Sequence, residues 1–210
     1  WPHWVLAALL WVLVLPFSGC TTPIRADRTT VRAAYRETTK TALEGHCSHD
    51  ARAVLHRHGL EDQFRKSPVE CLLRLHEQAC QDDRGDLLYA LAELNYLYGE
   101  RLARSAKAVD VRQARDFHLA AAIYAWFFLT GSGCAAAPDP FDRRFRVACD
   151  LYNRAVALGF VGGRRPETVV QWSRGARALV PGAVQIECHE STGDWTLDDI
   201  ERFLPADEYI

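Results

Sequence analysis

The sequence predicts a mainly α-helical protein: a multi-helix bundle followed by a small strand-rich C-terminal segment. Three observations predict this fold class. Apolar residues recur at three- or four-residue spacing through most of residues 28–163. Glycine, proline and polar residues interrupt that spacing at intervals typical of helices. After Gly162-Gly163, apolar and polar residues alternate with the two-residue period of half-buried strands.

The composition restricts the classes of protein to consider. The chain has 210 residues, a length that suits one domain or one and a half. Its 49% apolar and 10% aromatic content is that of a globular chain, not a disordered one. There are 25 Lys and Arg against 27 Asp and Glu, with no basic block, so no nucleic-acid partner is expected.

Local signals delimit the first helices. Helical spacing runs from Arg28 to about Leu43, and again from about His49 to His58, where Gly59 ends it. Ser67-Pro68-Val69-Glu70 predicts the start of a third helix, with Ser67 and Glu70 forming a capping box. The face of this helix expected to point inward comprises Val69, Leu72, Leu73, His76 and Cys80.

Three longer helices follow. Asp86–Arg104 is the clearest amphipathic helix, with its leucines on one face and Glu93 and Glu100 pointing elsewhere. The next runs from about Val111 to Leu129 and ends in eleven consecutive apolar residues, 119–129. Since a membrane span needs about 20 residues, this segment is predicted to be the central buried helix instead. Asp142 is predicted to cap the last helix, which runs to about Phe160.

The strand-rich segment and the domain boundaries follow from the same patterns. Two alternating runs, Thr168–Ser173 and Ala183–Cys188, indicate strands, and Pro181-Gly182 indicates a turn before the second. The expected organisation is an export signal over residues 1–19, a tether over 20–27 and a helical domain over 28–163. Residues 164–210 form the strand-rich segment, which is expected to lead into a further domain downstream.

The first twenty residues have the pattern of a bacterial export signal. Residues 1–19 carry no Asp, Glu, Lys or Arg, and Val5–Leu15 is an unbroken apolar run as long as a signal-peptide core. Phe17-Ser18-Gly19-Cys20 resembles the lipobox of bacterial lipoproteins, which implies cleavage before Cys20 and a diacylglycerol on its thiol. Thr21 after the cysteine favours the outer membrane, on its periplasmic face. An uncleaved membrane helix and an ordinary secreted protein are the alternatives.

No catalytic residue, metal or cofactor is predicted for this chain, because each candidate reaction centre is incomplete. Ser132 lies in Gly131-Ser132-Gly133, which lacks the strand-to-helix context of a hydrolase nucleophile. His76 and Cys80 have the spacing of a metal-binding helix but no evident third ligand, so core packing is the preferred interpretation. A denser group of possible metal ligands lies in and near a predicted interhelix loop, but its spacing matches no known zinc pattern. This group comprises His46, Cys47, His49, His56 and His58.

Asp150, Asn153 and Arg154 are the polar residues singled out for a structural role. They lie within about one turn on the last predicted helix, and Asp150 precedes Arg154 by four residues, the favourable order for an ion pair. We expect these three residues to form a buried polar network that fixes helix packing and docks the following domain. A role in contacting substrate is the alternative.

Two resemblances to known families add to this interpretation. Small and aromatic residues alternate in Leu87–Gly99 and Ala120–Trp126, which resembles tetratricopeptide helix hairpins without a fixed repeat of about 34 residues. Residues 91–100 and 121–126, and above all 141–146 with 148–154, resemble the N-terminal region of bacterial lipoproteins assigned to the α/β-hydrolases of lipase or esterase type. The resemblance implies a helical accessory region that precedes a serine-hydrolase domain, whose nucleophile, acid and histidine lie further along the chain. The alternative is a freestanding helical lipoprotein that serves as a scaffold for envelope proteins.

Overall fold

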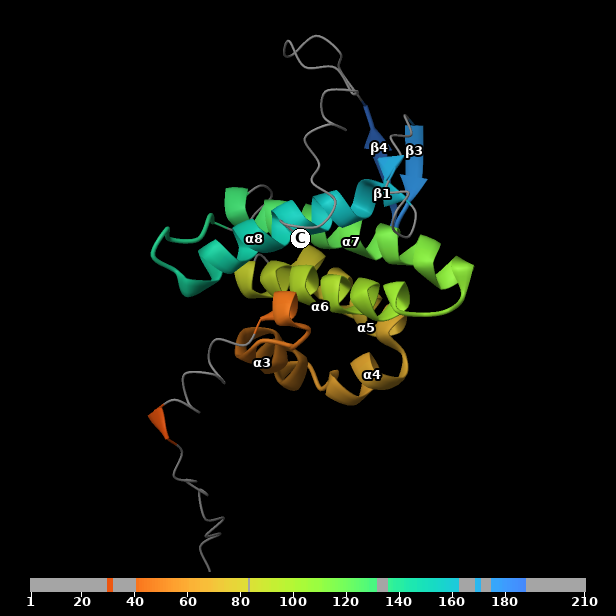
Figure 1. The fold of residues 1–210 in the computed structure, drawn as a ribbon. Coiled ribbons are helices and arrows are strands. Elements are labelled where there is room, and N and C mark those ends of the chain that lie inside the picture. The colour runs from red at the N-terminus through yellow and green to blue at the C-terminus, as the bar shows by residue number, and fades with distance from the viewer. Residues whose placement is uncertain are drawn as a thin grey trace, which may run out of the picture. The chain divides into compact units, whose positions relative to one another are not determined.

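The computed structural model describes residues 30–31, 41–82, 84–131, 136–162, 169–170 and 175–187. The chain divides into two compact units, Trp1–Ala34 and Tyr35–Ile210, and the account below concerns the second. Its described segments form a 3₁₀ turn, six α-helices and two small pairs of antiparallel strands (Figure 1). The predicted fold class, mainly helical with a small strand-rich segment toward the C-terminus, is confirmed.

The helices occupy the first three quarters of this unit. The 3₁₀ turn η2 (Ala42–Glu44) precedes α3 (His49–Arg57), α4 (Glu61–Lys66) and α5 (Pro68–Gln81). The three long helices are α6 (Gly85–Ala103), α7 (Ala108–Thr130) and α8 (Arg143–Phe160). The strands are β1 (Val161–Gly162), β2 (Val169–Val170), β3 (Gly175–Ala178) and β4 (Ala183–Ile186). In the part of the chain that is described, every helix is too short or too polar to span a membrane.

Helix α6 is the centre of the bundle. It contacts α7 and α8 on one side and α3 and α5 on the other (Figure 1). All eight residues from Tyr89 to Tyr96 are buried as a result. The prediction that α6 is amphipathic and α7 central is therefore wrong, and the solvent reaches α7 instead: Trp126 and Phe127 are 49% and 38% exposed.

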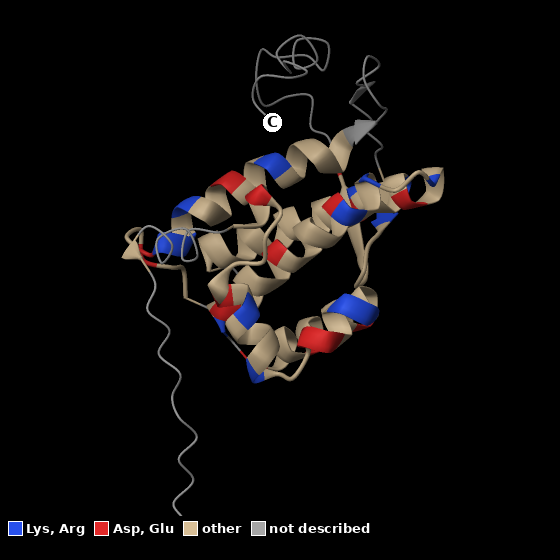
Figure 2. Cartoon of the chain, turned by 60° about the horizontal axis from the view of Figure 1, so that its bottom comes forward, with Lys and Arg blue, Asp and Glu red and all other residues tan. Residues whose placement is uncertain are grey.

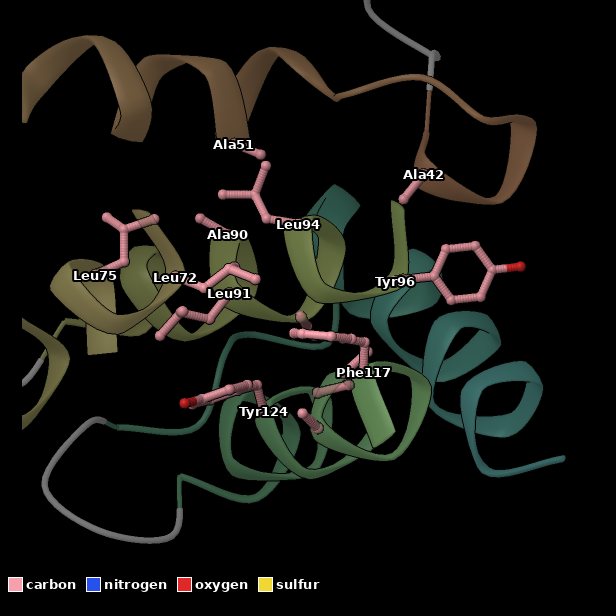
Figure 3. Packing of buried hydrophobic residues seen from close by; sticks show 14 of the residues in the cluster. Ala42, Ala51, Leu72, Leu75, Ala90, Leu91, Leu94, Tyr96, Phe117 and Tyr124 are labelled. Atoms are coloured by element: carbon pink, nitrogen blue, oxygen red, sulfur yellow. The ribbon is translucent and has the colours of Figure 1, made fainter. Parts of the chain in front are cut away.

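The main hydrophobic core joins side chains from η2, α3, α5, α6, α7 and α8. Leu72 and Leu75 of α5 lie opposite Leu91 of α6, and alanines such as Ala51 and Ala90 fill the narrow places between helices (Figure 3). Removing a leucine side chain from water contributes about 1.5–3 kcal/mol, so the fully buried leucines hold the layers together. Tyr124 lies on the α5 side of this core, whereas Tyr96 points to its opposite end (Figure 3).

Two serines precede helices, and only one of them caps. Ser48 has an extended backbone (φ −63°, ψ 165°), and its Oγ accepts a hydrogen bond from the Ala51 N–H of α3 (3.1 Å). Ser67 joins α4 directly to α5, and its N–H donates to the Gln63 carbonyl (2.7 Å) to close α4. Ser67 is also the N-cap residue of α5, with ψ 68°, and its side chain makes no capping hydrogen bond, so the predicted capping box with Glu70 is wrong.

The remaining helix ends agree better with the sequence. Pro68 is the first residue of α5, and the Asp142 carboxylate accepts from the Arg144 N–H (2.8 Å) at the start of α8, both as predicted. Gly131 ends α7 in the left-handed conformation (φ 62°) that glycine adopts without strain. The short helix α4 was not expected from the sequence, whereas α3, α5, α6, α7 and α8 lie close to their predicted bounds.

The β3–β4 hairpin packs on the helices. Gly175 pairs with Ile186 and Ala178 with Ala183, so the predicted turn at Pro181-Gly182 is confirmed. Arg177 of β3 places its Nε 2.7 Å from an Asp116 carboxylate oxygen on α7, and its Nη1 donates to the Gly159 carbonyl at the end of α8 (2.9 Å). One guanidinium therefore ties the hairpin to two helices.

Candidate functional site

A histidine, a cysteine and a tyrosine meet where α5 packs against α7. His76 and Cys80 are one turn apart on α5, and Cys80 Sγ lies 3.5 Å from His76 Nε2. On the other side of the imidazole, His76 Nδ1 lies 2.8 Å from the Tyr124 hydroxyl oxygen. The two rings also touch edge to face, with centroids 6.1 Å apart. The imidazole is thus fixed between a hydroxyl below it and a thiol beside it.

The surroundings determine the charge of each group. Burial lowers the pKa of His76, against a smaller opposing effect of Glu77, so its imidazole is neutral at pH 7. Burial also raises the pKa of Tyr124, which stays a neutral hydroxyl. In the tautomer in which His76 Nδ1–H donates to Tyr124, Nε2 carries the lone pair and accepts a hydrogen bond from the Cys80 thiol.

The thiol of this group is accessible from solvent. Cys80 is exposed and carries no disulfide, and His76 is half-buried. Core packing was the preferred interpretation of this pair, and for Cys80 it is wrong. The pair lies in the last turns of α5, where the Tyr124 side chain of α7 contacts the His76 ring. Accessible sulfur beside a neutral imidazole can bind a soft cation or react with a thiol reagent.

A second polar group is buried in the centre of the bundle. Glu93 of α6 is fully buried, although an outward position was predicted. Its carboxylate accepts hydrogen bonds from Ser48 Oγ, from the Tyr89 hydroxyl (3.1 Å) and from the Ala42 N–H (3.4 Å). Burial raises the pKa of Glu93, and these donors counteract it in part. Burial, followed by the Glu93 charge, also raises the pKa of the Cys47 thiol to about 12.

The hydrogen bonds of Glu93 join three elements. Ser48 Oγ accepts from α3 and donates to α6, while Ala42 brings in η2. Since no part of this carboxyl reaches solvent, we interpret Glu93 as a residue that positions the segment 41–48, not as an acid or base for a substrate.

A third group lies between α6, α7 and α8. His118 of α7 is almost fully buried and places Nε2 3.4 Å from a Glu100 carboxylate oxygen. Interaction with His118 lowers the pKa of Glu100, and the charges of Arg104 and Arg154 act in the same direction. The His118 ring rests directly on Gly99, where a Cβ atom would lie only 2.7 Å from two ring atoms. The close approach of α6 and α7 at Gly99 therefore places the His118 ring beside the Glu100 carboxylate.

Asp150, Asn153 and Arg154 do not form the buried network that the sequence suggested. Asp150 and Asn153 are exposed, and Asp150 pairs with Arg146 (3.2 Å) at the surface, not with Arg154. Arg154 points inward: its charge acts on Glu100 and Tyr96 of α6, and its buried Nε has no hydrogen-bond partner in the described segments. The prediction failed because Asp150 has an arginine four residues away on each side, and it pairs with Arg146. The Arg154 side chain instead lies toward Glu100 of α6.

The other candidates from the sequence stay apart or lie outside the described residues. His46, His49 and His56 are exposed and Cys47 and His58 half-buried, and His56 lies 3.7 Å from Glu61. Within the described ranges, no group of three or more His, Cys, Asp or Glu side chains could hold a metal ion. Cys20 and Ser132 lie outside the described residues.

Tyr124 and Glu93 are among the residues of these groups that the sequence analysis did not single out. Tyr124 looked like one apolar position among eleven, because its hydroxyl contact comes from a helix 48 positions earlier in the chain. Glu93 looked like a solvated helix position. Its neighbours Ala90, Ala92 and Asn95 are unusually small for an outer helix face, which is a usable signal of burial.

Charged residues at the surface form pairs and do not collect by sign. Lys and Arg positions are interspersed with Asp and Glu positions on the helices (Figure 2). Arg143 pairs with Asp50 (2.6 Å) and Arg57 with Asp86 (2.5 Å), which ties α8 to α3 and α3 to α6. Exposed pairs of this kind contribute about 0–1 kcal/mol each. They orient helices and do not mark a binding surface.

No family model matches the chain, and neither the curated proteins nor the solved structures include a significant match.

Proposed function

We propose that this chain is the lipid-anchored, helical accessory region of a bacterial envelope hydrolase of esterase or lipase type. The single observation that carries the anchor is the apolar run Val5–Leu15 followed by Phe17-Ser18-Gly19-Cys20. Small residues before a cysteine suit a signal peptidase that cuts there, and the freed cysteine takes the lipid. Each buried methylene contributes about 0.8 kcal/mol, so two or three acyl chains hold a protein at a membrane firmly.

The accessory role is supported by the kind of surface that α7 presents. Trp126 and Phe127 are large, apolar and partly exposed, and the Trp126 ring packs against Tyr152 of α8 with centroids 5.6 Å apart. Phe141, in the loop before α8, is 97% exposed. Exposed aromatic side chains on a rigid element are frequent where one domain contacts another. We propose the hydrolase domain of the same polypeptide as the contact of these residues.

Metabolic labelling tests the anchor. The gene is expressed in its native host in the presence of an alkyne-bearing palmitate, and the membrane-associated protein is isolated and coupled to a fluorophore. We expect a labelled band from the natural chain and none from Cys20→Ser. Cys149→Ser is the matched control and keeps the label, because it removes a cysteine from the helical domain only. A label that survives in Cys20→Ser, or its absence from the natural chain, contradicts the anchor.

An active-site probe tests the hydrolase. Membranes of the same host are treated with a fluorophosphonate, which modifies activated serine nucleophiles, and are then analysed with antibodies raised against this chain. We expect one polypeptide to carry both the probe and the antibody signal. An antibody-positive polypeptide that never takes the probe contradicts the hydrolase and favours the scaffold alternative, whatever the labelling experiment shows for Cys20.

A further inference from the structure

His76 and Cys80 lie one turn apart on α5, and their side-chain donor atoms lie close together near the surface. The two atoms, Nε2 and Sγ, are 3.5 Å apart. A zinc ion binds imidazole nitrogen at about 2.0–2.1 Å and thiolate sulfur at about 2.3 Å, so tetrahedral ligands of these two kinds lie about 3.6 Å from each other. The Sγ–Nε2 separation in α5 therefore matches the spacing of two ligands of one metal ion, which would replace the proton shared by the thiol and the imidazole.

The imidazole is oriented for this purpose by a residue of another helix. Ligand histidines usually donate their second ring N–H to an oxygen atom, which fixes the tautomer and the direction of the lone pair. Tyr124 supplies that oxygen, 2.8 Å from His76 Nδ1. Tyr124 is 7% exposed and packed into the main core, so the contact is held by the fold and not by a mobile side chain.

The two ligands are available and the other coordination positions are open. Cys80 is an exposed free thiol, and neutral His76 needs no deprotonation before it binds. Glu77 adds a negative charge beside the imidazole. No third ligand from the described residues joins the pair, so water or a group from another molecule fills the remaining positions.

We infer that His76 and Cys80 form a surface site for a zinc-class divalent cation, with Tyr124 as the residue that positions His76. This site is independent of the lipid anchor and of any hydrolase domain. A soft thiolate and a borderline imidazole select zinc or its neighbours in the first transition row over magnesium or calcium.

Cobalt provides the direct test, because a thiolate–cobalt bond gives a charge-transfer band in the near ultraviolet. The reduced full chain in detergent is titrated with Co²⁺ and then with Zn²⁺. We expect the band to appear with one metal per chain or per pair of chains, and Zn²⁺ to remove it by displacement. The band should be absent in Cys80→Ser and strongly reduced in His76→Gln.

Two further variants separate a built site from adventitious binding. Tyr124→Phe keeps both ligands and loses only the oxygen on Nδ1, so we expect cobalt affinity to fall about 10- to 100-fold. Cys149→Ser and His56→Gln are matched controls, which remove one thiol and one imidazole elsewhere and should leave the titration unchanged.

Three results would overturn the inference. The first is a band that persists in Cys80→Ser, since the metal then binds another thiol. The second is equal cobalt affinity of Tyr124→Phe and the natural chain. The third is no band at all, combined with a His76-dependent rate of Cys80 alkylation, which would make the pair a reactive thiol and not a metal site.

Discussion

Gly99→Ala is the most informative single substitution, because it tests how tightly α6 and α7 approach. A Cβ atom at position 99 would lie 2.7 Å from Cδ2 and Nε2 of His118 and 3.1 Å from the Ala114 carbonyl oxygen. Favourable contacts of such atoms begin at about 3.5 Å, so the ring must retreat by roughly 0.8 Å. His118 is only 2% exposed, and Tyr96 faces its ring with centroids 5.4 Å apart. There is little room for this retreat.

The expected cost follows from two opposing effects. Overpacking a filled core costs about 1–3 kcal/mol. Displacing the His118 ring also weakens its contact with the Glu100 carboxylate, which adds to this cost. Alanine is a better helix former than glycine by about 1 kcal/mol, which offsets part of that cost. We expect a net loss of about 1–2 kcal/mol in the free energy of unfolding. For a chain of this size, each kcal/mol lowers Tm by about 2–4 °C.

Urea and thermal unfolding followed by far-ultraviolet circular dichroism measure this loss. Gly85→Ala is the matched control in the same helix: its Cβ would meet the Phe128 ring at an ordinary 3.6 Å, so we expect a change within about 0.5 kcal/mol. In a His118→Ala background, Gly99→Ala should lose most of its effect, because the two changes share one contact. A Gly99→Ala chain as stable as the natural one would refute the clamped position of His118.

Three other substitutions test the hydrogen bonds of Glu93, its pKa and the surface position of Asp150. Ser48→Ala removes the α3 cap and one hydrogen-bond donor to Glu93, so we expect the free energy of unfolding in urea to fall by about 2 kcal/mol. Ser67→Ala is the control and should change that free energy by less than about 0.5 kcal/mol, because the Ser67 side chain makes no capping hydrogen bond. Equal effects of the two substitutions would contradict the capping role of Ser48. Because burial raises the pKa of Glu93, the folded state holds the Glu93 proton more tightly than the unfolded state does. The resulting stabilisation is fully present below the pKa that Glu93 has in the unfolded chain. It is lost as pH rises through the raised pKa of the folded state. Glu93→Gln should therefore gain stability relative to the natural chain as pH rises from about 4 to 8, and a difference independent of pH would count against a raised pKa. Asp150→Ala should change Tm by no more than about 2 °C, since Asp150 makes an exposed ion pair with Arg146, and such pairs contribute little. A larger fall in Tm would support a structural role for Asp150.

Much of the backbone could be predicted from short stretches of sequence. Pro68 at the start of α5, Asp142 at the start of α8 and Pro181-Gly182 before β4 all act on backbone groups within a few residues. Their effects are local, and so the sequence carries them. Ser67 shows the limit of this reasoning: it joins α4 to α5 with ψ 68°, not the extended backbone of Ser48, and its side chain makes no capping hydrogen bond.

The side chains of the candidate sites were predicted less well, for a different reason. Cys80 and Glu93 both occupy helix positions whose spacing indicates a face but not what covers it. Cys80 is exposed, whereas Ala42 of η2 and Ser48 at the start of α3 bond to Glu93, which is buried. Arg154 turns toward Glu100 because α6 lies on that side.

The sequence by itself determined the class of fold, most helix bounds and the proposal of a lipid at Cys20, because periodicity, end signals and a cleavage motif are written in neighbouring residues. Only the tertiary structure decided that α6 is the central helix, that Tyr124 orients His76 and that Cys80 faces solvent. These are relations between residues tens of positions apart. Burial and contact geometry arise from the order in which helices stack, and no single helix specifies that order.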